Sequence, residues 1–92
     1  MHNIHVQRNR KEVVEMITKT VRLQGHILDS LTFSKVLDKI LAQGGEYEVV
    51  RLVVGEANDD ISLAEIAISA KNEEILESIL KTIASYGAEV IP

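Results

Sequence analysis

Two stretches with helical character each end in glycine and lead directly into a strand-like run, and this repeated pattern limits the fold more than any other feature. The first ends at Gln43-Gly44-Gly45 before Glu46 to Val50, and the second at Tyr86-Gly87 before Ala88 to Ile91. Glycine just past a helix can take the left-handed conformation that closes it, because it lacks the Cβ that makes this conformation costly. The order strand, helix, strand is therefore expected twice.

The spacing of apolar residues predicts both helices. Between Phe33 and Leu41 apolar side chains recur at i, i+3, i+4, i+7 and i+8, which gathers them into one stripe at 3.6 residues per turn. A second stripe runs from Ile75 to Ile83. Ser30 or Thr32 is expected to cap the first helix and Asn72 the second, since a side-chain oxygen there can accept from an unpaired backbone N–H.

The strands are predicted from β-branched content and alternation. Residues Val13 to Leu23 could form a helix or a strand, but the β-branched run Ile17 to Val21 favours a strand. Tyr47 to Val54 is rich in valine and apolar on both sides, and Leu63 to Ala70 alternates in polarity. Residues 55–60 supply turn chemistry, so the two runs are expected to form a hairpin with a longish loop.

The order βαββαβ with short right-handed crossovers predicts an α+β fold, the ferredoxin-like sandwich. Its four-stranded antiparallel sheet would carry two helices on one face. The opposite face is expected to be mixed in polarity and apolar enough to seat a second copy or a neighbouring domain. The residues assigned to that sheet-face interface are Thr20, Arg22, Tyr47, Val49 and Val53, with Ala67 beside them.

Length and charge limit the number of domains and the classes of partner. The 92 residues suffice for one domain, predicted over residues 11–92 after a terminal arm of residues 1–10. Fourteen acidic against ten basic residues give a net charge of −4, which disfavours nucleic acid and anionic lipid as partners. The absence of cysteine excludes thiolate catalysis and suits a reducing, cytoplasmic location. No apolar run is long enough to predict a membrane span.

Residues with catalytic or metal-binding potential are few. Six internal serines lack a nucleophile-elbow context, and no G-x-G-x-x-G or P-loop pattern occurs. The pairs Asp59-Asp60 and Glu73-Glu74 fit a turn and a helix start better than a metal site. His26 beside Asp29 could act as acid, base or ligand, although a local hydrogen bond that shapes the loop is the more common role. No catalytic, cofactor or metal site is predicted in this segment.

The same strand order occurs in two kinds of binding module. RNA-recognition modules stack bases on exposed aromatic residues of the central strands, whereas this chain has only three aromatic residues, one of which belongs to a helix stripe. Regulatory modules of the ACT type bind amino acids near the loop between the first strand and the first helix. Residues Gly25 to Ser30 occupy that place, so an ACT-like module with an amino-acid ligand is an alternative function.

Three sequence blocks together resemble a known family. They are G-H-x-x-D-S at Gly25 to Ser30, G-G-x-[FY]-E-V at Gly44 to Val49, and Val53-Val54-Gly55. The chain resembles, from about Glu12 to Ile91, the conserved N-terminal region named after lysine-oxoglutarate reductase/saccharopine dehydrogenase (LOR/SDH). That region is found in archaeal and bacterial NAD-dependent ornithine cyclodeaminase-type proteins.

The resemblance implies a longer parent enzyme in which a Rossmann domain binds NAD and converts ornithine to proline with release of ammonia. This segment would then be a non-catalytic assembly domain, with its own C-terminal Rossmann domain and further copies as partners. A third hypothesis has His26 and Asp29 completing the parent's active site. The family's motif residues carry over with loop and turn roles, as a possible ligand or interface site: Gly25, His26, Asp29, Ser30, Gly44, Gly45 and Gly55.

Overall fold

The computed structural model describes residues 15–24, 30–54 and 61–92. Four strands and two helices follow one another in the predicted order βαββαβ. Their bounds are β1 Ile17–Gln24, α2 Ser30–Ala42, β2 Glu46–Val54, β3 Ile61–Ala70, α3 Glu73–Ala84 and β4 Glu89–Ile91. The stretch that could have been helix or strand is therefore a strand from Ile17 onward. The arm at residues 1–10 lies outside the described residues.

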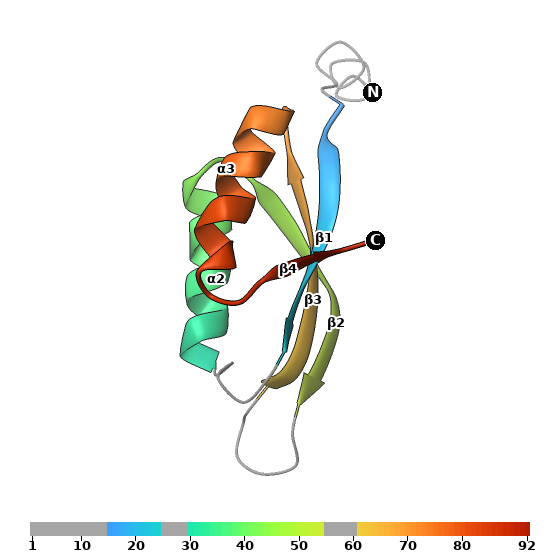
Figure 1. Ribbon diagram of the computed structural model, residues 1–92, viewed down its shortest axis with the longest axis vertical. Helices are drawn as coiled ribbons and strands as arrows, with labels where there is room; N and C mark the ends of the chain where they lie inside the picture. The colour runs from blue at the N-terminus through green and yellow to red at the C-terminus, as the bar shows by residue number, and fades with distance from the viewer. Residues whose placement is uncertain (1–14, 25–29, 55–60) are drawn as a thin grey trace, which may run out of the picture.

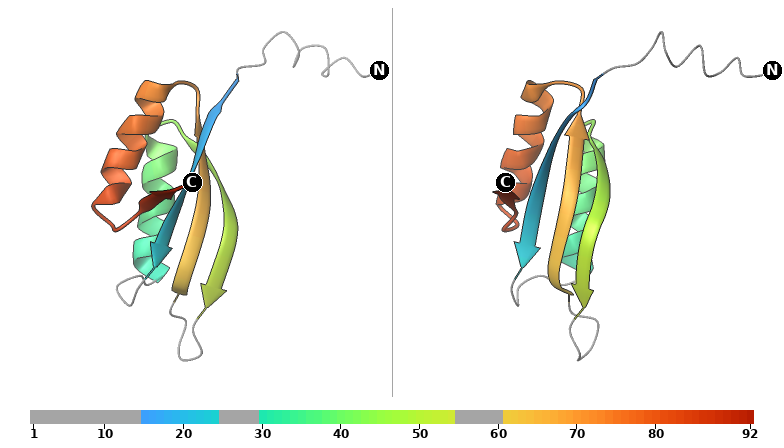
Figure 2. Two further views of the ribbon diagram at one scale, coloured as in Figure 1. Left: turned by 45° about the vertical axis from the view of Figure 1, so that its right-hand side comes forward. Right: turned by 90° about the vertical axis from the view of Figure 1, so that its right-hand side faces the viewer.

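The strands form one antiparallel sheet in the order β2-β3-β1-β4, with both helices on the same face (Figure 1). This confirms the predicted ferredoxin-like α+β architecture. The views in Figure 2 show α2 and α3 side by side over the sheet and β2 at one margin of it. The strands β2 and β4 are thus the two edges, and β4 pairs with β1 over only three residues, Thr20 to Arg22.

The hydrophobic core lies between the sheet and the helices. In β3 every second residue from Ala64 to Ala70 is completely buried, because successive side chains of a strand point to opposite faces. The helices contribute the stripes expected from their 3.6-residue period. The buried core residues are Val21, Leu23, Val36, Ile40, Ile61, Ala64, Ile66, Ile68, Ala70, Leu76, Ile79 and Ile83.

Both helices end in the same glycine-dependent motif. Gly44 and Gly87 have φ angles of 91° and 93°, which an L side chain rarely adopts. After α2, Gly44 N–H donates to the Leu41 carbonyl and Gly45 N–H to the Ile40 carbonyl, at 3.1 and 2.9 Å. Gly87 and the residue after it repeat this pattern at the end of α3. The paired bonds define a Schellman motif, so the predicted left-handed closure of both helices is confirmed.

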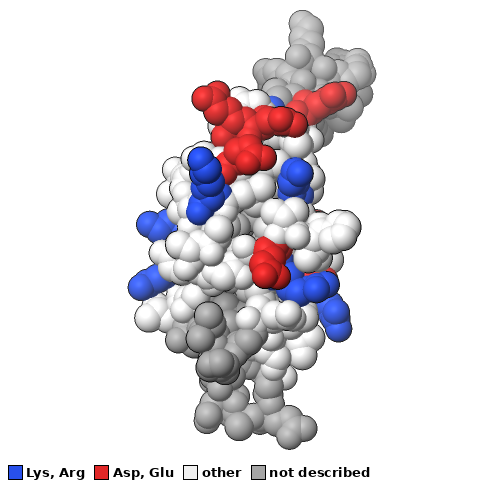
Figure 3. Space-filling view, viewed as in Figure 1, with Lys and Arg blue, Asp and Glu red and all other residues white. Residues whose placement is uncertain are grey.

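The start of α3 agrees with expectation. Asn72 Oδ1 accepts from the Ile75 N–H at 2.8 Å and caps that helix as predicted. Glu73 and Glu74 occupy its first turn, and Figure 3 shows acidic side chains gathered at the end of the molecule where α3 begins. The helix α2 begins at Ser30, so Thr32 lies inside it, and the position before Ser30 is outside the described residues.

Candidate interaction surface

The loop predicted to bind a ligand falls mostly outside the described residues. Gly25, His26, Asp29 and Gly55 are not described, and Ser30 is the first residue of α2. The ACT-like amino-acid pocket and the His26 and Asp29 site therefore stay predictions from sequence.

Gly44 and Gly45 are described, and each is glycine for a different reason. A Cβ on Gly44 would meet no atom within 4 Å, so the positive φ angle alone requires glycine there. A Cβ on Gly45 would lie 2.6 Å from Ile79 Cδ1 and 3.1 Å from Ile40 Cγ2. Gly45 thus lets the chain pass close to both helices as it turns from α2 into β2, and the motif pair has a structural role at this position.

The open face of the sheet carries a row of alternating charges. The strand register places one charged residue from each strand in a line across β4, β1, β3 and β2. These residues are, in that order, Glu89, Arg22, Glu65 and Arg51. Arg22 Nε donates to Glu65 Oε2 at 3.0 Å, and Arg51 Nη1 lies 3.9 Å from the same oxygen. Thr18 and Ser69 add a hydroxyl hydrogen bond of 2.7 Å. This face is more polar than the sequence predicted.

The strand register also corrects the predicted membership of that face. Directly opposed residues of antiparallel strands point to the same side. Thr20 and Arg22 oppose Ala67 and Glu65 on the open face, and Val53, opposite Leu63, joins them. Tyr47 and Val49 instead oppose the core residues Ile68 and Ile66, so they lie on the helix side of the sheet.

A β-bulge explains this error. The register shifts between Val49 and Arg51, which leaves Val50 as an extra residue on β2. Strict alternation, from which the prediction was made, puts Tyr47 and Leu52 on opposite faces. The extra residue reverses the alternation, and Tyr47, Val49, Leu52 and Val54 all share the helix side.

The helices leave this side of β2 largely uncovered. All nine residues of β2 are exposed, and six of them are large and apolar. Val50 and Val54 are 57% and 54% exposed, and Leu52 is 46% exposed. No strand among the described residues pairs with the outer margin of β2. An edge strand with free backbone groups and apolar side chains is a surface ready to associate.

One residue of α2 extends this surface. Gln43, just after the helix, exchanges hydrogen bonds with Thr82 and Ser78 of α3, at 2.6 and 2.8 Å, which fixes the side of α2 that faces α3. Leu41 lies two residues earlier, roughly 200° around the helix axis, and so faces away from α3 toward β2. Its side chain is 54% exposed. We call the group the β2 edge surface: Leu41, Tyr47, Val49, Val50, Leu52 and Val54.

Comparison with known proteins identifies the family. Residues 18–92 match the family model described as the LOR/SDH bifunctional enzyme conserved region. The chain belongs to the LOR/SDH family. The ornithine cyclodeaminase of Methanopyrus kandleri is 42% identical to this LOR/SDH domain over 80 residues, 87% of the chain but 18% of that protein. The bifunctional arginine dihydrolase/ornithine cyclodeaminase AgrE of Nostoc sp. is 33% identical over 75 residues, 82% of the chain and 11% of that protein.

Solved structures agree with this assignment. The ternary complex of AgrE with ornithine and NAD+ superposes with a TM-score of 0.75 at 33% identity, over 86% of this domain and 12% of that chain. Apo ArgZ, an arginine dihydrolase from cyanobacteria, superposes with a TM-score of 0.72 at 28% identity, over 87% and 13%. The LOR/SDH domain thus spans less than a fifth of the length of these relatives.

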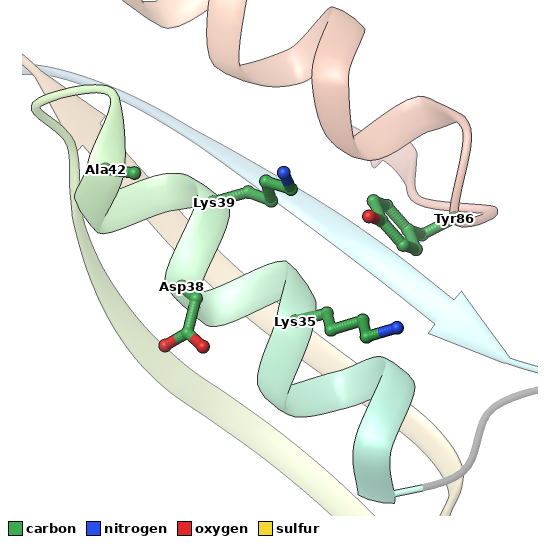
Figure 4. A pocket seen from close by; sticks show the side chains of 5 residues that line it. All are labelled: Lys35, Asp38, Lys39, Ala42 and Tyr86. Atoms are coloured by element: carbon green, nitrogen blue, oxygen red, sulfur yellow. The ribbon is translucent and has the colours of Figure 1, made fainter.

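A groove between the helices is one of the concave features in the described part of the LOR/SDH domain. It has a volume of about 400 Å³ and is lined by Lys35, Asp38, Lys39, Ala42 and Tyr86. Figure 4 shows both lysine side chains on the side of α2 that faces Tyr86, with Asp38 pointing the other way. The sequence carries no signal for this groove, because a solvated helix face has the same lysine spacing. The lysines are exposed, which fits such a face.

Two further findings limit the functions available to the described part of the LOR/SDH domain. Within residues 15–24, 30–54 and 61–92, no three His, Asp or Glu side chains gather where they could hold a metal ion. No helix in those same ranges has the length and apolar character to cross a membrane. Charge is also spread without a broad basic patch on the face drawn in Figure 3.

Proposed function

We propose that this LOR/SDH domain is a non-catalytic assembly domain of an NAD-dependent ornithine cyclodeaminase-like enzyme. Its contacts join copies of the enzyme to one another or to its catalytic domain. Other parts of the enzyme bind NAD and convert ornithine to proline with release of ammonia. The observation that carries the proposal is the β2 edge surface, where five large apolar side chains of a fully exposed strand lie together with Leu41. A monomeric domain rarely leaves a long apolar edge uncovered.

The relatives support the same role. Their names record ornithine cyclodeaminase activity, and the AgrE complex contains ornithine and NAD+, while the matched domain makes up 12% of that chain. A dinucleotide site of the Rossmann kind needs a glycine-rich turn that opens a helix. The segments of this chain before α2 and α3 contain a single glycine between them, Gly25. We therefore assign NAD to a Rossmann domain elsewhere in the enzyme.

The experiment compares the full-length enzyme that carries this domain with a form lacking residues 15–92. Multi-angle light scattering reports the oligomeric state, and proline formation from ornithine with NAD reports activity. We expect the shortened enzyme to lose its oligomeric state. Retention of the native oligomer together with full activity would overturn the proposal.

A point variant tests the non-catalytic part. His26→Ala in the full-length enzyme should leave kcat for ornithine unchanged, because an assembly domain supplies no reacting group. A large loss of kcat with the oligomer and thermal stability intact would make His26 a participant in the reaction and contradict the proposal.

A further inference from the structure

We infer that β2 pairs antiparallel with β2 of a second copy of this chain, across a two-fold axis that passes between Val49 and Val50. In this register Glu48 of each copy lies opposite the partner's Arg51, and two four-stranded sheets join into one. The inference rests on the proposed assembly function and names its surface and its partner.

The bulge makes β2 symmetric about its centre. When a strand pairs antiparallel with a copy of itself, the numbers of any two opposed residues add up to the same sum. The two opposed residues must also point to the same face of the sheet. In a regular strand this condition requires residues of the same parity. Here the extra residue Val50 reverses the parity halfway along, so residues on the two sides of the bulge share a face when their numbers have an odd sum, as they do at 99.

In that register each pair formed between residues 46–48 and residues 51–53 shares a face. Glu48 and Arg51 both point to the open face, where their opposed residues on β3 are Ala67 and Glu65. Tyr47 and Leu52 both point to the helix side. Glu46 and Val53, which would also meet across the axis, share the open face. Registers centred on Val49 or on Val50 would instead place charged open-face side chains opposite apolar helix-side ones.

Charge complementarity favours the same register. Glu48 and Arg51 are both exposed, and opposing them across a two-fold axis creates two pairs of opposite sign. Within the described residues Glu48 has no ion-pair partner, and Arg51 has only the 3.9 Å contact to Glu65, with 60% of its side chain exposed. Both groups are thus available to a partner strand.

Self-complementarity selects a second copy over an unrelated chain. A strand from an unrelated protein could form the same backbone hydrogen bonds with β2. A copy of β2 also carries the order of glutamate, bulge and arginine that is complementary to β2 when the strand is reversed. The other edge does not compete, because β4 is three residues long. The helix sides of the paired strands would bring two β2 edge surfaces together and cover their apolar side chains.

A charge-swap series on the 92-residue chain tests the register. Glu48→Arg and Arg51→Glu each turn two attractive pairs into two repulsive ones, so each should weaken the dimer about tenfold or more. The double variant Glu48→Arg/Arg51→Glu restores both pairs in reverse and should regain the dimer. Sedimentation equilibrium measures the dissociation constant of each form.

Glu46→Arg is the matched control. It makes the same change of charge on the same face of the same strand, but its predicted neighbour is the partner's Val53, so the dimer should be retained. Arg51→Glu also places a carboxylate near Glu65, so circular dichroism and thermal unfolding check its fold. If Arg51→Glu weakens the dimer only because the chain folds poorly, adding Glu48→Arg will not restore the dimer. If it weakens the dimer through charge repulsion, adding Glu48→Arg will restore it.

Cross-linking gives an independent measure of the register. The chain contains no cysteine, so introduced thiols report without background. A mixture of Glu48→Cys and Arg51→Cys chains should form disulfide-linked dimers under oxidation. Glu48→Cys alone should not, because the partner's residue 48 is offset by three residues, about 10 Å, beyond the reach of a disulfide.

Each failure has its own meaning. A chain that stays monomeric at high concentration overturns the β2 pairing. A swap variant that does not recover, or self-cross-linking of Glu48→Cys, overturns the proposed register. If deletion of the domain breaks up the full-length enzyme while the charge reversals leave its oligomer intact, the assembly function stands and the β2 register is wrong. If deletion has no effect, the proposed function itself fails.

Discussion

Two adjacent glycines at the end of α2 show how much a missing side chain can determine. Gly44 is required by its backbone conformation and Gly45 by the atoms around it, Ile79 and Ile40. The sequence indicated a helix end at both positions. It could not indicate the second requirement, because the clash involves α3, which is more than thirty residues away along the chain.

Gly45→Ala should destabilise the domain by about 1–3 kcal/mol, since a Cβ 2.6 Å from Ile79 Cδ1 and 3.1 Å from Ile40 Cγ2 forces the surrounding side chains to repack. Chemical denaturation measures the loss. The control is the double variant with Ile79→Val, which removes the Cδ1 atom. We expect the two substitutions together to cost less than the sum of their separate effects, and strict additivity would show that the contact does not matter.

Gly44→Ala should cost about 1–2 kcal/mol for a different reason, since alanine is strained at a φ angle of 91° although no atom obstructs its Cβ. Gly44→Asn should cost less, because asparagine tolerates the left-handed region better. The free energy of unfolding compares the two. Equal losses for alanine and asparagine would contradict this explanation.

At the scale of the elements, local signals were sufficient for helices and insufficient for β2. The helices follow from apolar spacing, the glycine ends and the Asn72 cap, all of which are local in sequence. The bulge at Val50 is fixed by pairing with β3, and a run of valines carries no sign of it. For this reason the strand was predicted correctly while two of its residues, Tyr47 and Val49, were assigned to the wrong face.

The start of α3 offers a direct check on local signals. Asn72→Ala removes the oxygen that accepts from the Ile75 N–H and should lower the free energy of unfolding by about 1 kcal/mol. Asn72→Asp keeps an acceptor at the same position and should remain close to the unsubstituted chain. Urea titrations of the three proteins decide this, and an alanine variant as stable as the asparagine form would rule out a stabilising cap.

At the scale of the whole molecule, the fold was predictable and the candidate surface was only partly so. Element order fixes the architecture, because few sheet topologies suit βαββαβ. The association surface depends on which apolar residues the helices fail to cover, and that depends on where α2 lies relative to β2. Leu41 illustrates the difficulty, because its place in the amphipathic stripe suggested burial, whereas half of its surface is exposed.

Pairing of two copies predicts that stability depends on concentration. When only folded chains form the dimer, a higher protein concentration favours the folded form and raises the unfolding temperature. We expect the thermal midpoint of the 92-residue chain to increase over a hundredfold concentration range in differential scanning calorimetry. The Glu48→Arg variant should show little such dependence, and a midpoint of the original chain that does not move would argue against pairing.

The extra residue in β2 has a genetic consequence. Removing the single codon for Val50 would return the strand to ordinary alternation and leave Tyr47, Val49, Leu52 and Val54 together on the helix side. Glu48 and Arg51 would then stand two positions apart on the open face, and the shortened strand would oppose its own reversed copy about Val49. A deletion of three nucleotides would thus remove the bulge and keep the same opposing pairs, which separates the role of the bulge from the role of the charges.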